Sequence, residues 1–383
     1  MHPFISLIMP VYNNEKYFPK AVQSVIAQSF HDWELVIVED GSTDNTPMIA
    51  DKLAETDERI RVVHQQNQWI YASVNNGTEI AAGKYVFMFN SDDLLNQDAL
   101  QRIHDIAVID DADIVMFNLS ENTCDEEQNI IERDVNGRSR YLADDFSYTD
   151  RDDIHRKWID FMKLGLVNHQ CVYKAKLAKK NKMRNDTYAG DYLYNIQLAD
   201  QINVAAGTAY EVYMYMNYQK EEANISLGKY YGYEHDMYNG MYLEYKALFE
   251  QWGIYGNEVK SYLSKLRMQK LSREFRLIKI QRWSVDEKLK EMLNHISDDI
   301  IHEIASENNK EEELESRMFS ACRELFIENV PDQESDFYFL YELLDSLLRY
   351  EKTQEDLEKI RAGVYHELNP KHIGKCFMQM LVP

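Results

Sequence analysis

The sequence has no hydrophobic run long enough to cross a membrane and no basic segment ahead of its first apolar stretch. Its four cysteines, Cys124, Cys171, Cys322 and Cys376, are far apart and form no metal-binding pair. Isolated cysteines of this kind are typical of free thiols in a reducing cytosol. These absences predict a soluble, cytoplasmic protein.

Positive charge is also scarce, because 42 Lys and Arg residues face 65 Asp and Glu residues and leave a formal net charge of −23. Nucleic-acid binding requires clustered cations, so we expect no nucleic-acid partner. Uniform attraction to an anionic membrane is disfavoured for the same reason. No Gly-x-Gly-x-x-Gly or Walker-type loop follows the first strand. Nucleotidyl transfer would need a glycine-rich basic loop there, and Asn13-Asn14-Glu15-Lys16 is not one.

The most informative stretch begins with five uncharged residues, Tyr85 to Phe89, which read as a strand buried on both faces. Asn90-Ser91-Asp92-Asp93 follows directly. In open α/β sheets, ligands bind outside the carboxyl ends of the strands. Carboxylates at that place suit a hard cation such as Mg2+ or Mn2+, although four residues alone could equally form an acidic loop that caps the next helix.

The preceding and following residues alternate between apolar strands and amphipathic helices. We predict strands at 4–9, 34–38, 61–63, 85–89 and 113–117, and helices at 18–28, from 46 onward, at 71–81 and at 97–109. This alternation predicts a doubly wound parallel sheet whose strands bring polar residues to one edge. Residues 118–153 are acidic and polar and are predicted to form a solvated loop.

A chain of 383 residues is expected to hold two or three domains. Beyond about residue 233 the pattern is helical, with segments near 236–252, 258–282, 285–306, 311–329, 335–350 and 354–363. Lys260 to Arg282 is rich in basic residues that spiral around the helix, which weakens a membrane-binding role and favours pairing with the acidic helices that follow. We predict that this tail packs on the preceding domain or on a second subunit, forming a homo-oligomer.

Three motifs in order carry a resemblance: Pro10-Val11-Tyr12-Asn13-Asn14-Glu15, then Val38-Glu39-Asp40-Gly41-Ser42-Thr43-Asp44, then Asn90-Ser91-Asp92-Asp93. Over roughly residues 3–230 the chain resembles a glycosyltransferase of family 2. The resemblance implies the GT-A fold, an α/β fold with a doubly wound mixed sheet, here with an appended C-terminal α-helical domain. The expected divisions are a nucleotide-sugar-binding half at 1–117, an acceptor-binding half at 118–232 and the helical domain at 233–383.

The resemblance also implies roles for individual residues. Pro10, Val11, Tyr12 and Asp40 would hold the base and ribose of a nucleotide, usually uridine, and Asp92 would bind the metal that bridges its diphosphate. The full set expected to contact the donor is Pro10, Val11, Tyr12, Glu15, Asp40, Asn67, Asn75, Asn90 and Ser91. Asp191 would be the general base.

Four positions depart from the family pattern. Asn90 stands where the first acid of the Asp-x-Asp motif is usual, Trp69 replaces a glycine, Val74 replaces an arginine, and Gly190 replaces a glutamate. Asn90, Val74 and Gly190 suggest the main alternative, a non-catalytic member that binds a nucleotide sugar or a glycan.

The expected reaction uses Mn2+ or Mg2+ to stabilise the departing nucleoside diphosphate as a Lewis acid. A sugar hydroxyl is a poor nucleophile and needs a base within hydrogen-bond reach. Asp191 is the expected base, and His169 is an alternative base or acceptor contact. We therefore expect an inverting glycosyltransferase with a UDP-sugar donor and a glycan or lipid-linked acceptor of surface polysaccharide synthesis, located in the cytoplasm with peripheral membrane contact as a further expectation.

Overall fold

A computed structural model describes residues 2–125, 127–133, 141–164, 171–186, 190–218 and 230–284, together with residues 287, 288, 291, 294 and 295. The chain divides into two compact units. The first unit contains residues 1–223 and 247–254, and the second contains residues 224–246 and 255–383. The expected three-part division at residues 117 and 232 stays a prediction.

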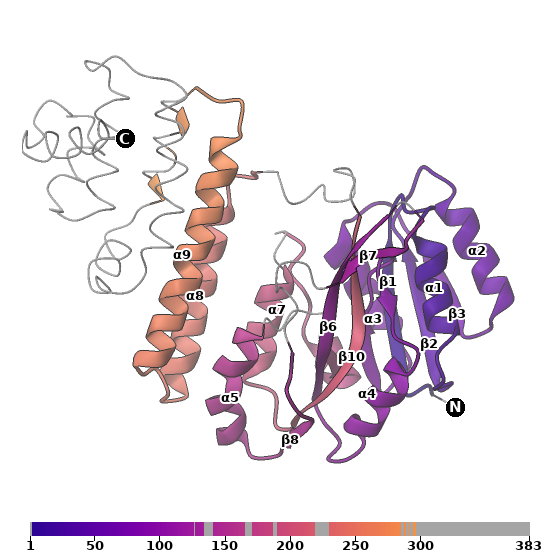
Figure 1. Ribbon diagram of the computed structural model, residues 1–383, viewed down its shortest axis with the longest axis horizontal. Helices are drawn as coiled ribbons and strands as arrows, with labels where there is room; N and C mark the ends of the chain where they lie inside the picture. The colour runs from indigo at the N-terminus through magenta and orange to yellow at the C-terminus, as the bar shows by residue number, and fades with distance from the viewer. Residues whose placement is uncertain are drawn as a thin grey trace, which may run out of the picture. The chain divides into compact units, whose positions relative to one another are not determined.

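The first unit is built on a mixed sheet with the strand order β3-β2-β1-β4-β9-β6-β10-β5 (Figure 1). Its strands are β1 (Ile5–Val11), β2 (Trp33–Glu39), β3 (Ile60–His64), β4 (Tyr85–Met88), β5 (Leu94–Leu95), β6 (Ile114–Cys124), β7 (Ile130–Arg133), β8 (Phe146–Tyr148), β9 (Cys171–Lys174) and β10 (Ala205–Tyr218). The strands β3, β2, β1 and β4 are parallel, with β1 between β2 and β4. Their carboxyl ends therefore meet at one edge, as the alternation predicted.

Two expectations about the sheet were wrong. It is not wholly parallel, as the alternation predicted, but mixed, as the resemblance implied, because β9 runs antiparallel to both β4 and β6. The predicted loop at 118–153 also begins with structure, since β6 continues to Cys124 and β7 and β8 follow. The polar residues of β6 are held in the sheet because they pair with β10 along the length of both strands. The sequence around β6 does not indicate that these polar residues pair with β10.

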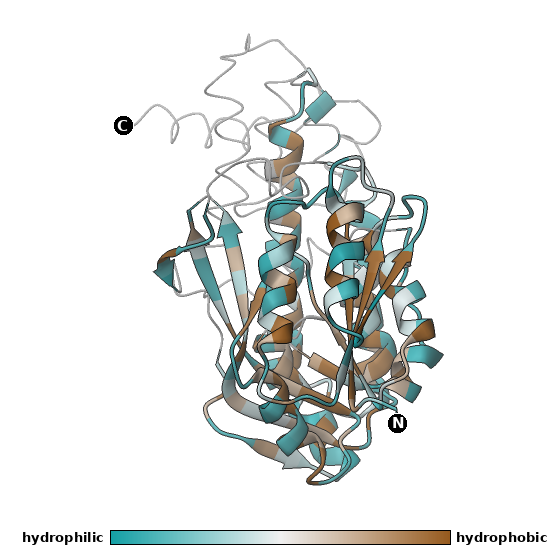
Figure 2. Ribbon diagram, turned by 90° about the vertical axis from the view of Figure 1, so that its right-hand side faces the viewer, coloured by the Kyte–Doolittle hydropathy of each residue, from teal (hydrophilic) through white to brown (hydrophobic). Residues whose placement is uncertain are grey.

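Helices cover both faces of this sheet. They are α1 (Phe18–Ile26), α2 (Thr46–Thr56), α3 (Ile70–Ile80), α4 (Ala99–Ala107), α5 (Arg151–Lys163), α6 (Ala175–Lys180) and α7 (Gly190–Ala199). Alternate residues of β1, from Ile5 to Val11, pack with α1, α2 and α4 in the main core. The opposite side of β1 faces α3. Figure 2 shows the apolar strands enclosed between helices that carry polar residues outward.

In the second unit the structure describes α9 (Asn257–Lys279) and most of α8 (Glu234–Gln251), whose last residues belong to the first unit. The two helices are joined by contacts from the basic run. Arg267 donates a hydrogen bond to the Asn239 side chain at 2.7 Å and lies over the Tyr242 ring, and Lys270 lies over the Tyr238 ring. The basic side chains therefore contact aromatic and amide groups of α8.

Several expectations fall outside the described residues. These are the helices beyond residue 295, the acidic partners expected for α9, the oligomeric role of the tail, and His169. Among the helices that the structure describes, none combines the length and the apolarity needed to span a membrane.

Candidate functional site

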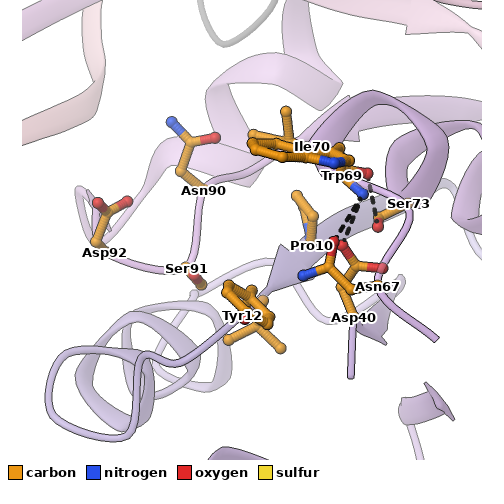
Figure 3. Close-up of a pocket in the computed structure, with 11 residues that line it drawn as sticks. Pro10, Tyr12, Asp40, Asn67, Trp69, Ile70, Ser73, Asn90, Ser91 and Asp92 are labelled. Atoms are coloured by element: carbon orange, nitrogen blue, oxygen red, sulfur yellow. Dashed lines mark hydrogen bonds between the residues drawn. The ribbon is translucent and has the colours of Figure 1, made fainter. Parts of the chain in front are cut away.

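A pocket of about 450 Å³ opens at the carboxyl ends of β1, β2 and β4 (Figure 3). Its lining residues are Pro10, Val11, Tyr12, Asp40, Asn67, Trp69, Ile70, Ser73, Asn90, Ser91 and Asp92. Eight of these were expected from the sequence to contact a nucleotide sugar or its metal. Parallel register brings them together, because β1 pairs with β2 on one side and with β4 on the other.

Asp40 is buried and organises one wall of the pocket. Its Oδ1 accepts hydrogen bonds from Gln65 Nε2 at 2.7 Å and from the Gln68 amide at 2.8 Å. Its Oδ2 accepts one from the Trp69 amide at 3.0 Å. The carboxylate thus ties the end of β2 to the loop that leads into α3, in addition to lining the pocket.

The next residue, Gly41, has φ +73°, a conformation that costs little only for glycine. A Cβ at this position would lie 2.9 Å from the Asn67 amide nitrogen and 3.2 Å from the Gln65 carbonyl oxygen. The close approach of the two loops therefore requires glycine here.

Trp69 has a backbone conformation that favours glycine, the residue that the family pattern places at its position. Its φ is 72° and its ψ is 163°, a region that is essentially restricted to glycine and costs about 1–3 kcal/mol for other residues. Its side chain is 70% exposed. The indole lies on the pocket wall opposite Tyr12 and close to Pro10 in Figure 3.

The segment after β4 separates its two carboxylates into different environments. Asp93 is buried and its carboxylate accepts hydrogen bonds from Tyr213 Oη at 2.6 Å, the Met216 amide at 2.8 Å and Asn90 Nδ2 at 3.0 Å. Asp92 is partly exposed and lies on the pocket wall. One carboxylate is therefore a structural acceptor and the other is open to a ligand.

Burial raises the pKa of Asp92. For Asp93, burial and the neighbouring Asp92 carboxylate together raise the pKa well above its ordinary value, against the opposing effect of its hydrogen bonds. The doubly ionised pair is therefore costly unless a cation lies nearby.

Two expected donor contacts lie outside the lining residues. Glu15 Oε2 accepts hydrogen bonds from the Asn45 amide at 3.0 Å and from Asn45 Nδ2 at 2.7 Å, closing the loop before α2. Asn75 exchanges hydrogen bonds with the backbone of Met183, at 2.8 and 2.9 Å. Both residues thereby hold segments that lead to the pocket or to α7. Val74, where an arginine is usual, is buried in α3.

Asp191 lies in the first turn of α7 and accepts a hydrogen bond on Oδ1 from Tyr71 Oη at 3.0 Å. Tyr71 belongs to α3, next to the pocket residue Ile70. A Cβ on Gly190 would lie 2.3 Å from the Arg184 carbonyl oxygen and 2.9 Å from the Tyr71 ring. Glycine at this position thus lets the Tyr71 ring reach the α7 terminus and contact the neighbouring carboxylate.

Sequence reasoning missed several residues of the site. Trp69 was noted only as a departure, and Ile70, Ser73 and Tyr71 gave no signal except their proximity to Asn67. The anchoring of Asp93 by Tyr213 joins residues 120 positions apart, which no local pattern indicates.

Residues 6–178 match the sequence model of glycosyl transferase family 2. Glycosyltransferase GlyG of Streptococcus pneumoniae serotype 4 (strain ATCC BAA-334 / TIGR4) is 34% identical over 119 residues, which cover 31% of this chain and 40% of GlyG. TuaG of Bacillus subtilis (strain 168), named for teichuronic acid biosynthesis, is 40% identical over 101 residues, covering 26% of this chain and 40% of TuaG. The chain thus spans about two fifths of these relatives.

The fold has solved counterparts. S. aureus TarS 1-349 in complex with UDP-GlcNAc superposes with a TM-score of 0.56 at 17% identity, covering 91% of this chain and 93% of that one. The same protein in complex with UDP gives a TM-score of 0.56, covering 92% and 94% of the two chains. The fold is GT-A, as the resemblance implied. The match of residues 6–178 to glycosyl transferase family 2 confirms the expected family.

Proposed function

We propose that the protein is a metal-dependent, inverting glycosyltransferase that takes its sugar from a UDP-sugar and passes it to a glycan or lipid-linked acceptor of surface polysaccharide synthesis. The observation that carries this proposal is the placement of Asp92. It is the one carboxylate of the Asn90–Asp93 segment that lines the pocket, while Asp93 is committed to three hydrogen bonds.

The donor set fits a hard divalent cation. Mg2+ is usually held by one or two carboxylates together with substrate phosphates and water, and does not need a cage made wholly of protein ligands. Asp92 supplies one carboxylate at the pocket wall, next to Ser91 and Asn90. A bound Mn2+ or Mg2+ would neutralise the charge that develops on the departing diphosphate. Asn90 carries no charge, and its side chain instead donates a hydrogen bond to Asp93.

The other end of the pocket suits a nucleoside. Tyr12 and Trp69 are exposed aromatic side chains on its walls, and flat rings of this kind stack on nucleobases. A carboxylate oxygen offers two lone pairs, so Asp40 retains acceptor capacity beyond the loop hydrogen bonds. The complexes of TarS with UDP-GlcNAc and UDP, which share the fold, support a uridine nucleotide as the donor.

Asp191 is the proposed base. The hydrogen bond from Tyr71 orients its carboxylate, which in this proposal takes the proton of an acceptor hydroxyl. Attack by that hydroxyl on the anomeric carbon, opposite the departing diphosphate, is a single displacement that inverts the configuration. The names of GlyG and TuaG support glycosyl transfer, and that of TuaG supports a cell-surface polymer as the destination.

The test measures UDP affinity by calorimetry with and without Mn2+. The unmutated protein should bind UDP more tightly with Mn2+, and Asp92→Asn should bind UDP with an affinity that Mn2+ does not change. Asp98→Asn is a matched control, because Asp98 is exposed and its hydrogen-bond acceptor survives the change. Equal affinity with and without metal in the unmutated protein would contradict the metal site. Absence of any turnover across a panel of UDP-sugars would favour the non-catalytic alternative.

A further inference from the structure

A second group of metal-ligating side chains lies in the second unit, formed by other segments of the chain than those that line the pocket. His235 comes from the first turn of α8, Glu274 from α9, and His295 from the segment that follows. One ligand atom from each of the three lies within 4.8 Å of the other two. Glu274 and His295 are buried, with side chains 2% and 8% exposed.

The distances between the ligand atoms match those expected between two ligands of one metal ion. His235 Nδ1 lies 3.3 Å from Glu274 Oε2, and His295 Nδ1 lies 3.2 Å from the same oxygen. Zinc bonds of about 2.0–2.2 Å to nitrogen and oxygen, at tetrahedral angles, place two ligand atoms about 3.3–3.5 Å apart. The carboxylate oxygen is therefore already at the ligand-to-ligand separation from both imidazole nitrogens.

Both ring nitrogens of His295 have a carboxylate nearby, Glu274 at Nδ1 and Glu291 at Nε2. His295 Nε2 lies 3.5 Å from Glu291 Oε1 and 3.4 Å from Tyr230 Oη, and Tyr230 Oη donates to Glu291 Oε1 at 2.6 Å. Metal-bound histidines typically direct their second ring nitrogen at a carboxylate, and Glu291 stands in that position beside His295 Nε2. The other nitrogen, Nδ1, is buried, and although Glu274 Oε2 lies 3.2 Å away, the pair does not have hydrogen-bond geometry. A buried polar atom without a hydrogen bond is costly, and a cation beside it removes that cost.

We propose that His235, Glu274 and His295 form a site for a borderline-soft divalent ion of the Zn2+ type. Two imidazoles with one carboxylate suit Zn2+ or Co2+ better than Mg2+, which prefers oxygen ligands. The two rings are stacked, with centroids 4.5 Å apart and planes 13° from parallel, and both have Nδ1 beside the Glu274 carboxylate. The ion ties α8, α9 and the segment at residue 295 together.

The experiment uses the full chain, stripped with a chelator and titrated with Co2+ in the presence of excess Mg2+, which occupies the oxygen site at Asp92. One equivalent of Co2+ should bind and produce the visible d–d bands of a nitrogen-ligated ion. His235→Asn and the isosteric Glu274→Gln should weaken binding by at least about 100-fold, because loss of a supporting residue alone costs 10–100-fold. Zn2+ should raise the melting temperature of the unmutated protein and leave those of the two variants unchanged.

Two controls make the outcome decisive. His31→Asn removes an exposed histidine, and Asp92→Asn removes the pocket carboxylate, so both should keep the Co2+ bands. Far-ultraviolet circular dichroism establishes that each variant is folded. No uptake of Co2+ by the unmutated protein would overturn the proposal, as would bands that persist in Glu274→Gln or vanish in Asp92→Asn. None of these outcomes depends on sugar transfer.

Discussion

Replacing Trp69 tests two claims: that the backbone at this residue is strained, and that its indole on the pocket wall contributes to nucleotide binding. Trp69→Gly and Trp69→Ala both remove the indole, which is 70% exposed and makes up part of the wall. Only glycine adopts φ 72° and ψ 163° without strain. The two variants should therefore lose nucleotide affinity equally while differing in their free energy of unfolding.

The magnitude follows from two opposing terms. Release of the strain stabilises the glycine variant by about 1–3 kcal/mol. Greater freedom of glycine in the unfolded chain costs it about 0.4–1 kcal/mol relative to alanine. The net expectation is that Trp69→Gly is more stable than Trp69→Ala by about 0.5–2 kcal/mol. Loss of stacking on the base is worth about 1–3 kcal/mol, so UDP affinity should fall by about 5- to 150-fold in both variants.

Chemical denaturation measures the stability difference, and calorimetry with UDP and Mn2+ measures the affinity. The Asp40 hydrogen bond to the residue 69 amide involves only backbone on that side, so it survives in both variants. Equal stability of the glycine and alanine variants would refute the strain argument. Unchanged UDP affinity in both would refute the stacking role of the indole, whatever the stability result.

Three further expectations follow from the same structure. Asp191→Asn keeps an acceptor for Tyr71, so stability and UDP affinity should stay near normal while sugar transfer falls by about 100-fold or more, and near-normal transfer would place the base elsewhere. Gly41→Ala should cost at least about 1–2 kcal/mol of stability. Gly240 lies within α8 and a Cβ there would meet no neighbouring atom, so Gly240→Ala should stabilise the protein by about 0.5–1 kcal/mol. Denaturation curves of the two variants measure this difference. Hydrogen bonds to Asp51 and Glu39 raise the pKa of His64 above 6.5, although burial opposes this shift. The contribution of His64 to the free energy of unfolding is therefore fully present below pH 6.5 and is lost as the pH rises through the folded-state pKa. His64→Gln should therefore lower the melting temperature more at pH 5.5 than at pH 8.5, and only slightly because the side chain is 45% exposed; a larger loss at the higher pH would contradict the sign.

The first half of the sheet could be predicted because each strand from β1 to β4 carries its own apolar run and ends in polar residues. The parallel register then follows from the alternation with helices, and it brings Tyr12, Asp40 and Asp92 to one edge. The second half could not be predicted in this way. β6 continues through Asn118, Ser120 and Asn122 because β10 supplies partners for a polar strand, and that pairing is a long-range event.

The same distinction applies within the pocket. Asp92 was identified from its place after a buried strand, which is local information. The different environment of Asp93 depends on hydrogen bonds from Tyr213 and from the Met216 amide, both in β10. A motif therefore indicates which carboxylates are available, but the three-dimensional packing decides which of them is left open to a ligand.

The departures from the family pattern around α3 are structurally linked. Trp69 has a backbone conformation that favours glycine, and its indole adds a ring to the pocket wall. Two residues later, Tyr71 reaches Asp191, and it has room to do so because Gly190 carries no side chain. A glutamate at residue 190 would collide with the Tyr71 ring and with the chain at Arg184. The departure at residue 69 thus adds a ring to the pocket wall, and the departure at residue 190 makes room for Tyr71 to position the carboxylate that the motif retains.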